Sequence, residues 1–169
     1  MNPIGISAIQ EFHESYQASM FESNGWMIPQ KYTSIADEIT TVEKFVGIYD
    51  ISSYVKFIFY GDNVLEILQL NFQLLNSLND QVNILKSVDY GFSLLLGKLT
   101  KNEYFIFVDQ SYKTLVMEIV KMSSKGVFHF VDMTSGLTGI RLLGPMACDV
   151  IASVSSFDLR NKKFSNMSV

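Results

Sequence analysis

The sequence has few of the residues that form disulfide bonds or bind metal ions. It contains one cysteine, Cys148, so no internal disulfide can form, which is typical of a protein from a reducing compartment. Neither of its two histidines, His13 and His129, has a second ligand at metal-binding spacing. We therefore expect no metal site, and we interpret His129, in VFHFVD, as a strand residue that faces solvent or forms a hydrogen bond.

Long apolar runs and targeting signals are also missing. No run approaches the roughly 20 residues that a membrane helix needs. The N-terminal stretch MNPIGISAIQEFHESYQ lacks the basic and apolar regions of a signal peptide. The sequence therefore predicts a cytoplasmic protein that does not enter a membrane.

Positive charge is scarce, and so are the short motifs of common enzymes. The chain has 13 Lys and Arg against 17 Asp and Glu, a net charge of −4, with no basic stripe for a nucleic-acid backbone. It has no GxGxxG, GxxxxGK[ST] or GxSxG motif. The position of Cys148 on a predicted helix favours a structural cysteine over a nucleophile, and the pair Asp37-Glu38 is explained by the dipole of a helix start. These features alone identify no enzyme.

Apolar and aromatic residues are abundant. The chain of 169 residues is 48% hydrophobic, with 13 Phe and 8 Tyr, and its length suits one domain. The excess of aromatic residues has two interpretations: a surface buried against another subunit, or a Phe-rich core. Composition does not choose between them.

Periodicity predicts an α+β fold, with a mixed or antiparallel sheet and helices on one face. Ser34 is a plausible N-cap for the second helix, and Gly47 is placed where a C-cap glycine is expected. Residues 20–32 are expected to be irregular, residues 76–83 a polar turn and residues 157–169 a polar tail. The predicted helices are 7–16, 33–45, 64–75, 111–122 and 146–153, and the predicted strands are 48–51, 54–60, 92–99, 103–109, 127–132 and 137–143.

Three segments, in order, resemble one known family. They are NGWMIPQKY (24–32), VGIYDISSYVKFIFYG (46–61) and VDMTSGLTGIRLLGPMACDVI (131–151). Each is weak alone, but together they resemble the folate-binding family of the glycine cleavage T-protein, or aminomethyltransferase. The resemblance implies a single shortened domain over residues 1–169 with the N-terminal part of the T-protein fold. It also implies a role in one-carbon transfer from an amine to tetrahydrofolate.

The resemblance implies site residues as well. Asn79-Asp80-Gln81-Val82 is similar to the family's Asn-Asp-Val motif with one residue inserted, so Asp80 is the candidate catalytic residue that would hold and polarise the folate amine. The pair Asn79-Asp80 is also an ordinary turn dipeptide, as are turns at Asp89 and Asp109. The implied tetrahydrofolate contacts are Met27, Tyr32, Asp80, Tyr90 and Phe92.

Departures from the family pattern imply a protein partner. The family's Gly-rich segment is shortened between residues 96 and 102, and full-length relatives continue into further domains that complete the folate site. The partner would be a larger folate- or flavin-binding subunit, or a second copy of the chain. Residues 157–164 (FDLRNKKF) resemble a segment of the sarcosine oxidase gamma subunit. Three functions stay open: an aminomethyltransferase or one piece of a split one, a non-catalytic gamma-type subunit of an amine-oxidising complex, and a stand-alone folate-binding regulatory module.

Overall fold

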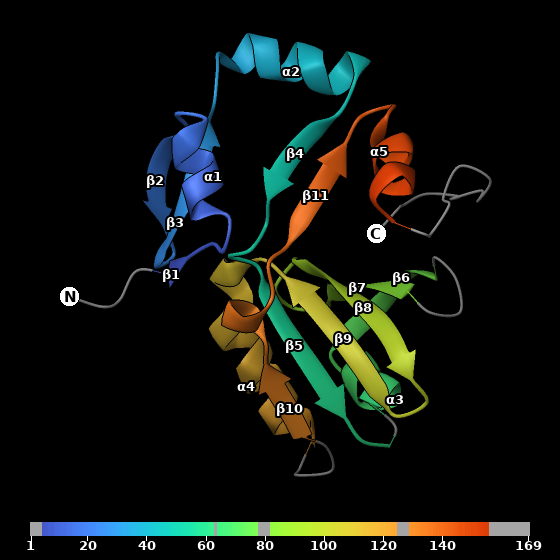
Figure 1. Cartoon of the computed structure of the whole chain (residues 1–169). Helices are drawn as coiled ribbons and strands as arrows, with labels where there is room; N and C mark the ends of the chain where they lie inside the picture. Colours follow the sequence, from blue (N-terminus) through green and yellow to red (C-terminus); the bar gives the residue numbers. More distant parts are fainter. Residues whose placement is uncertain (1–4, 63, 78–81, 125–128, 156–169) are drawn as a thin grey trace. The chain divides into compact units, whose positions relative to one another are not determined.

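The chain folds into two compact units, shown in Figure 1. The computed structural model describes residues 5–62, 64–77, 82–124 and 129–155. Of the described residues, unit 1 comprises 5–53 and 138–155, and unit 2 comprises those between 54 and 137. Unit 2 is thus inserted into the chain of unit 1. Strands and helices occur in both units, which confirms the predicted α+β class.

Unit 2 is built on a six-stranded antiparallel sheet. The strand order is β10-β5-β9-β8-β7-β6. Strand β9 shows the alternation that a half-covered sheet needs, because Tyr104, Ile106 and Val108 are buried while the residues between them are only partly covered. The strands are β5 (Val55–Tyr60), β6 (Phe72–Ser77), β7 (Val82–Ser87), β8 (Ser93–Thr100), β9 (Glu103–Val108) and β10 (His129–Asp132).

Two helices cover one face of this sheet and complete its core. Helix α3 (Val64–Gln69) buries Val64 and Leu68, and helix α4 (Lys113–Ser124), which follows the short η1 (Gln110–Tyr112), buries Val116 and Val120. These side chains pack on the buried residues of β5, β7, β8 and β9. The placement of helices on one face agrees with the prediction for this unit.

One predicted helix of unit 2 is only half correct. The segment 64–75 is helical as far as Gln69, and Phe72 then begins strand β6, which pairs with β7. The predicted turn 76–83 is wrong where it overlaps the ends of these two strands. The spacing of Leu68 and Phe72 suits a helix and a strand equally, and the pairing partner that decides the matter is distant in sequence. The strands predicted at 92–99 and 103–109 are confirmed as β8 and β9, which pair with each other in antiparallel orientation.

The described part of unit 1 holds two small sheets and three helices. Helix α2 starts as predicted. Ser34 Oγ accepts the N–H of Asp37 at 3.1 Å, and the Glu38 carboxylate accepts the N–H groups of Tyr32 and Thr33. One sheet has the order β1-β3-β2 and the other pairs β4 with β11. The elements are β1 (Gly5–Ile6), α1 (Gln10–Ser15), β2 (Ser19–Ser23), β3 (Trp26–Lys31), α2 (Ile35–Lys44), β4 (Gly47–Asp50), β11 (Ile140–Leu143) and α5 (Ala147–Val154).

Residues 20–32, predicted to be irregular, form the β2–β3 hairpin instead. Asn24 and Gly25 both have positive φ angles, 49° and 80°, as a two-residue hairpin turn requires. Proline usually interrupts strands because it has no backbone N–H, yet Pro29 lies in β3. It is tolerated there because β1 pairs only with Trp26 and Met27 and needs no hydrogen bond from position 29.

One further prediction in unit 1 needs correction. Gly47 does not cap α2 but opens β4, and a Cβ there would lie 2.5 Å from Val42 Cγ2, so close packing explains the glycine. The strands predicted within 127–132 and 137–143 are present as β10 and β11, with η2 (Thr134–Gly136) between them, and they pair in different sheets, β10 with β5 and β11 with β4.

Several expectations concern residues that the structure does not describe. The polar tail 157–169 and the motif centred on Asp80 lie outside the described residues. Within the described part of the chain, no helix combines the length and the apolar character that crossing a membrane requires.

Candidate functional site

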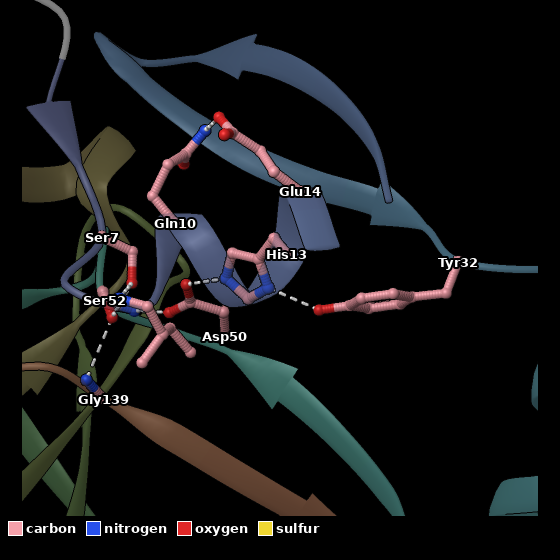
Figure 2. A network of polar contacts seen from close by, with 9 residues as sticks. Ser7, Gln10, His13, Glu14, Tyr32, Asp50, Ser52 and Gly139 are labelled. Atoms are coloured by element: carbon pink, nitrogen blue, oxygen red, sulfur yellow. Dashed lines mark hydrogen bonds and ion pairs between the residues drawn. The ribbon is translucent and has the colours of Figure 1, made fainter. Parts of the chain in front are cut away.

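Unit 1 contains a buried polar network centred on His13, which Figure 2 shows from close by. His13 projects from α1 and is 2% exposed. Its Nε2 lies 2.8 Å from Asp50 Oδ2, at the end of β4, and its Nδ1 lies 2.5 Å from the hydroxyl of Tyr32, just after β3. One imidazole therefore joins the first helix to the ends of two strands.

The charge state of Asp50 fixes the direction of these hydrogen bonds. Burial raises the pKa of Asp50, but hydrogen bonds from Ser52 and His13 outweigh it and hold the pKa below the ordinary 3.8. The backbone N–H of Ser52 donates to Asp50 Oδ1 at 2.8 Å. Because the carboxylate is ionised at neutral pH, His13 donates to it from Nε2, and the Nδ1 of a neutral ring then accepts from Tyr32.

Tyr32 is held as a hydrogen-bond donor. Burial, and then the negative charges of Asp50 and Glu38, raise the pKa of its phenol above the ordinary 10.0. The hydroxyl stays protonated at physiological pH and can donate to His13. The ring is therefore fixed at its oxygen, while the side chain remains half-buried.

A second set of contacts extends the network toward β11. Ser7 Oγ donates to Ser52 Oγ at 3.3 Å, and Ser52 Oγ accepts the N–H of Gly139 at 3.2 Å. The N–H of Ile51 donates to the carbonyl of Gly139 at 2.8 Å. A Cβ on Gly139 would meet Ile51 at 3.0–3.3 Å, so glycine permits this approach. The network thus connects residues that flank the insertion of unit 2.

Comparison with known proteins points to one family. Residues 9–82, which include His13, Tyr32 and Asp50, match the GCVT N-terminal domain. An aminomethyltransferase of Clostridium botulinum (strain Okra / Type B1) is 24% identical over 97% of this chain and 46% of its own length. An aminomethyltransferase of Chlorobaculum tepidum is 28% identical over 88% of this chain and 43% of its own length.

The fold agrees with the sequence matches. The crystal structure of the glycine cleavage system aminomethyltransferase T from Bartonella henselae superposes with a TM-score of 0.72 at 19% identity, covering 89% of this chain and 43% of that one. The chain is similar in sequence to aminomethyltransferases, and its fold is similar to the N-terminal part of the T-protein. The predicted resemblance to this family and to the N-terminal part of its fold is confirmed. The chain spans less than half the length of the relatives it matches.

The structure places the predicted site residues of the chain in both units. Met27, on β3, and Tyr32 lie in unit 1 and are half-buried, and only Tyr32 belongs to the His13 network. Tyr90 lies in unit 2, 55% exposed, in the turn after β7. Phe92 is 4% exposed and stacks on Tyr112 at 4.4 Å within the core of unit 2. With Asp80 outside the described residues, the predicted site stays a prediction.

Sequence analysis did not identify His13 or Asp50 as a pair. The sequence shows His13 only as a histidine without a second metal ligand at suitable spacing, and it places Asp50 within the predicted strand 48–51. The pattern Asp50-Ile51-Ser52 was a usable signal, because an Asp side chain often accepts the N–H two residues further on, which leaves its second oxygen for another donor. The identity of that donor depends on the tertiary fold.

A pocket of about 490 Å³ lies in unit 2. Its wall includes Asp62, whose carboxylate accepts a hydrogen bond from the Asn102 amide at 2.7 Å. None of the predicted site residues lines it. Its full lining is Asp62, Leu65, Glu66, Lys101, Asn102 and Tyr104.

Proposed function

We propose that this T-protein relative binds tetrahydrofolate and takes part in one-carbon transfer from an amine to that cofactor, together with a second polypeptide. The observation that carries the proposal is the match to aminomethyltransferases over 97% of the chain. The match runs through the segment that holds Met27 and Tyr32 and through the motif that includes Asp80.

The described residues suit a flat aromatic heterocycle. Pterin rings stack on aromatic side chains and pack against thioethers. In unit 1, Met27 and Tyr32 offer such groups while only partly covered, and in unit 2 Tyr90 is 55% exposed. Phe92 is buried in the core of unit 2, where it stacks on Tyr112. Tetrahydrofolate, when bound, supplies the amine nitrogens that accept the carbon.

The chain's own residues have distinct roles in this proposal. Asp80 holds and polarises a folate amine by its charge and by accepting a hydrogen bond. Tyr32 packs against the cofactor, and His13, itself held by Asp50, fixes the Tyr32 hydroxyl at 2.5 Å and so keeps the ring in one orientation. His13 and Asp50 are positioning residues here, since they act through Tyr32.

A second polypeptide completes the proposed enzyme. The matched relatives contain more than twice the length that this chain covers, because 46% of the Clostridium botulinum protein suffices for the match. We propose that the partner supplies the remaining walls of the folate site. A non-catalytic gamma-type subunit of a sarcosine oxidase-like complex is the alternative, supported by the resemblance of residues 157–164, and a folate-binding regulatory module is a third possibility.

Tryptophan fluorescence tests the proposal directly. Trp26 is the one tryptophan of the chain and is the neighbour of Met27. Titration with tetrahydrofolate, on the chain alone and with its co-purified partner, should quench this fluorescence in a saturable manner. Saturation only in the complex would support the role of the partner.

A charge-removing variant tests the assigned residue. Asp80→Asn should lower folate affinity or single-carbon transfer at least about tenfold, as expected for loss of a charged hydrogen bond. Asp89→Asn, at an exposed turn position, is the matched control and should change neither. Unchanged folate affinity and activity in Asp80→Asn would remove Asp80 from the site, and no quenching in either preparation would rule out folate binding.

A further inference from the structure

The hydrogen bonds around Asp50 have a direction that one fixed donor enforces. The backbone N–H of Ser52 donates to Asp50 Oδ1 at 2.8 Å, and a backbone N–H has no lone pair with which to accept. Asp50 is 5% exposed and His13 is 2% exposed, so bulk water has little access to the contact between them. Asp50 Oδ2 therefore accepts the Nε2–H of His13 at 2.8 Å.

The imidazole of His13 transmits this direction to the Tyr32 hydroxyl. A neutral imidazole holds one ring proton, so donation from Nε2 leaves Nδ1 with a lone pair. Nδ1 lies 2.5 Å from the Tyr32 oxygen, and the contact requires the phenol to donate its proton. Figure 2 shows the imidazole between the carboxylate and the phenol. Asp50 thus determines the direction of a hydrogen bond in which it takes no part.

The Tyr32 oxygen keeps lone pairs that this network does not use. A phenol oxygen that donates its proton to one partner can still accept from another. Among the described residues, His13 is the one hydrogen-bond partner of this oxygen, and the Tyr32 side chain is half-buried. A ligand at this oxygen can gain a hydrogen bond only by donating one. A ligand lone pair at the same place would be left without a partner.

We infer that Tyr32 is a specificity residue whose oxygen accepts a hydrogen bond from a ring N–H of the cofactor, and that Asp50, acting through His13, fixes Tyr32 in this role. The inference rests on the proposed function, since it requires folate to bind beside Tyr32. Two ring nitrogens that carry hydrogen in tetrahydrofolate are lone-pair acceptors in folic acid. Tyr32 therefore favours the reduced ring over the oxidised ring.

The direction of the hydrogen bonds can be measured without any cofactor. His129→Gln leaves His13 as the only histidine of the chain, so the ring signals of isotope-labelled histidine belong to one residue. At about pH 8, where free histidine is neutral, nitrogen NMR should show a protonated Nε2 and an unprotonated Nδ1.

Asp50→Asn in the same background should reverse these two states. The new amide must keep its oxygen for the Ser52 N–H, so it turns its nitrogen toward His13 and donates to Nε2. The ring proton then moves to Nδ1. A protonated Nδ1 in the protein with Asp50 intact would overturn the inference.

Cofactor preference tests the role of Tyr32 itself. The ratio of the dissociation constants of folic acid and tetrahydrofolate is obtained from Trp26 quenching, in the preparation that binds tetrahydrofolate. Tyr32→Phe should lower this ratio at least about fivefold, the effect of one hydrogen bond. Asp50→Asn should lower it as well, because the phenol then donates to the ligand. Tyr16→Phe removes the hydroxyl of a 63% exposed side chain of unit 1 and should change the ratio less than about twofold.

The outcomes distinguish this inference from the proposed function. An unchanged ratio in Tyr32→Phe, or equal affinity of the parent protein for the two folates, would overturn the inference and leave folate binding intact. No quenching by tetrahydrofolate in any preparation would instead refute the proposed function, and the inference with it. Circular dichroism checks that each variant is folded. Tyr32→Phe, which loses a single oxygen atom, decides the matter if Asp50→Asn does not fold.

Discussion

His13, Asp50 and Tyr32 form the most tightly defined group of residues in unit 1. The imidazole contacts a carboxylate on one side and a phenol on the other, at 2.8 and 2.5 Å, and it is 2% exposed. Removing one member of such a group lowers the free energy of unfolding, because a buried carboxylate or hydroxyl is left without its hydrogen-bond partner. Since few apolar residues of unit 1 are buried, this network is a principal source of its tertiary order.

The lowered pKa of Asp50 predicts a loss of stability in acid. The unfolded chain takes up the Asp50 proton near the ordinary 3.8, while the folded chain takes it up only at lower pH. Between these values the unfolded state binds more protons, so the free energy of unfolding falls as the pH is lowered. Asp50→Asn should destabilise unit 1 by about 1–3 kcal/mol at pH 7, and the difference from the wild type should shrink below about pH 4.

Urea unfolding followed by Trp26 fluorescence measures this effect, because Trp26 lies in unit 1. Asp89→Asn, at an exposed position, serves as the control and should follow the wild type at every pH. A constant difference between Asp50→Asn and the wild type from pH 7 to pH 3 would contradict the assignment of the Asp50 charge.

At the scale of single elements, glycine packing is the most specific constraint. Gly144, between β11 and α5, has a φ angle of 124°, and a Cβ there would lie 2.5 Å from the carbonyl oxygen of Phe45 and 2.6 Å from that of Val42. Gly144→Ala should therefore cost about 2–5 kcal/mol, the sum of backbone strain and collision. Gly25 also has a positive φ angle, 80°, but nothing within 4 Å of its Cβ position, so Gly25→Ala should cost only about 1–2 kcal/mol.

Thermal or urea unfolding followed by circular dichroism compares the two variants with the wild type. The difference between them isolates the collision of a side chain at position 144 with the end of α2. Equal losses of stability in Gly144→Ala and Gly25→Ala would show that the close approach of Gly144 to Phe45 and Val42 is not a constraint.

Local pattern predicted the elements whose signal lies within their own residues. The cap at Ser34 and the aromatic run of β5 were sufficient to place α2 and that strand. Local pattern gave the wrong element where pairing with another strand decides the structure. Phe72 begins β6 because it pairs with β7, and Pro29 is tolerated in β3 because β1 is short and does not reach it. For the same reason, the sequence identified Tyr32 through family resemblance but could not show that His13 holds its hydroxyl.

At the scale of the whole molecule, the two units differ in how they are stabilised. Unit 2 has a contiguous apolar core between its sheet and two helices, whereas the described part of unit 1 relies on a polar network and leaves α2 and the β4–β11 ribbon exposed. Unit 2 is also continuous in sequence over residues 54–137, while unit 1 must close a chain loop of that length to pair β4 with β11. Loop closure has an entropic cost that increases with length.

We therefore predict that the two units unfold separately. In urea, Trp26 fluorescence, which reports unit 1, should change at a lower midpoint than far-UV circular dichroism, to which the six-stranded sheet of unit 2 contributes strongly. Phe57→Ala, at a fully buried position of unit 2, should lower the circular dichroism midpoint, since such a substitution costs about 3–5 kcal/mol. Ile39→Ala, on exposed α2, is the control and should shift neither midpoint appreciably. Coincident transitions of the two probes in the wild type would show that unit 1 draws its stability from unit 2, and would contradict the prediction that the two units unfold separately.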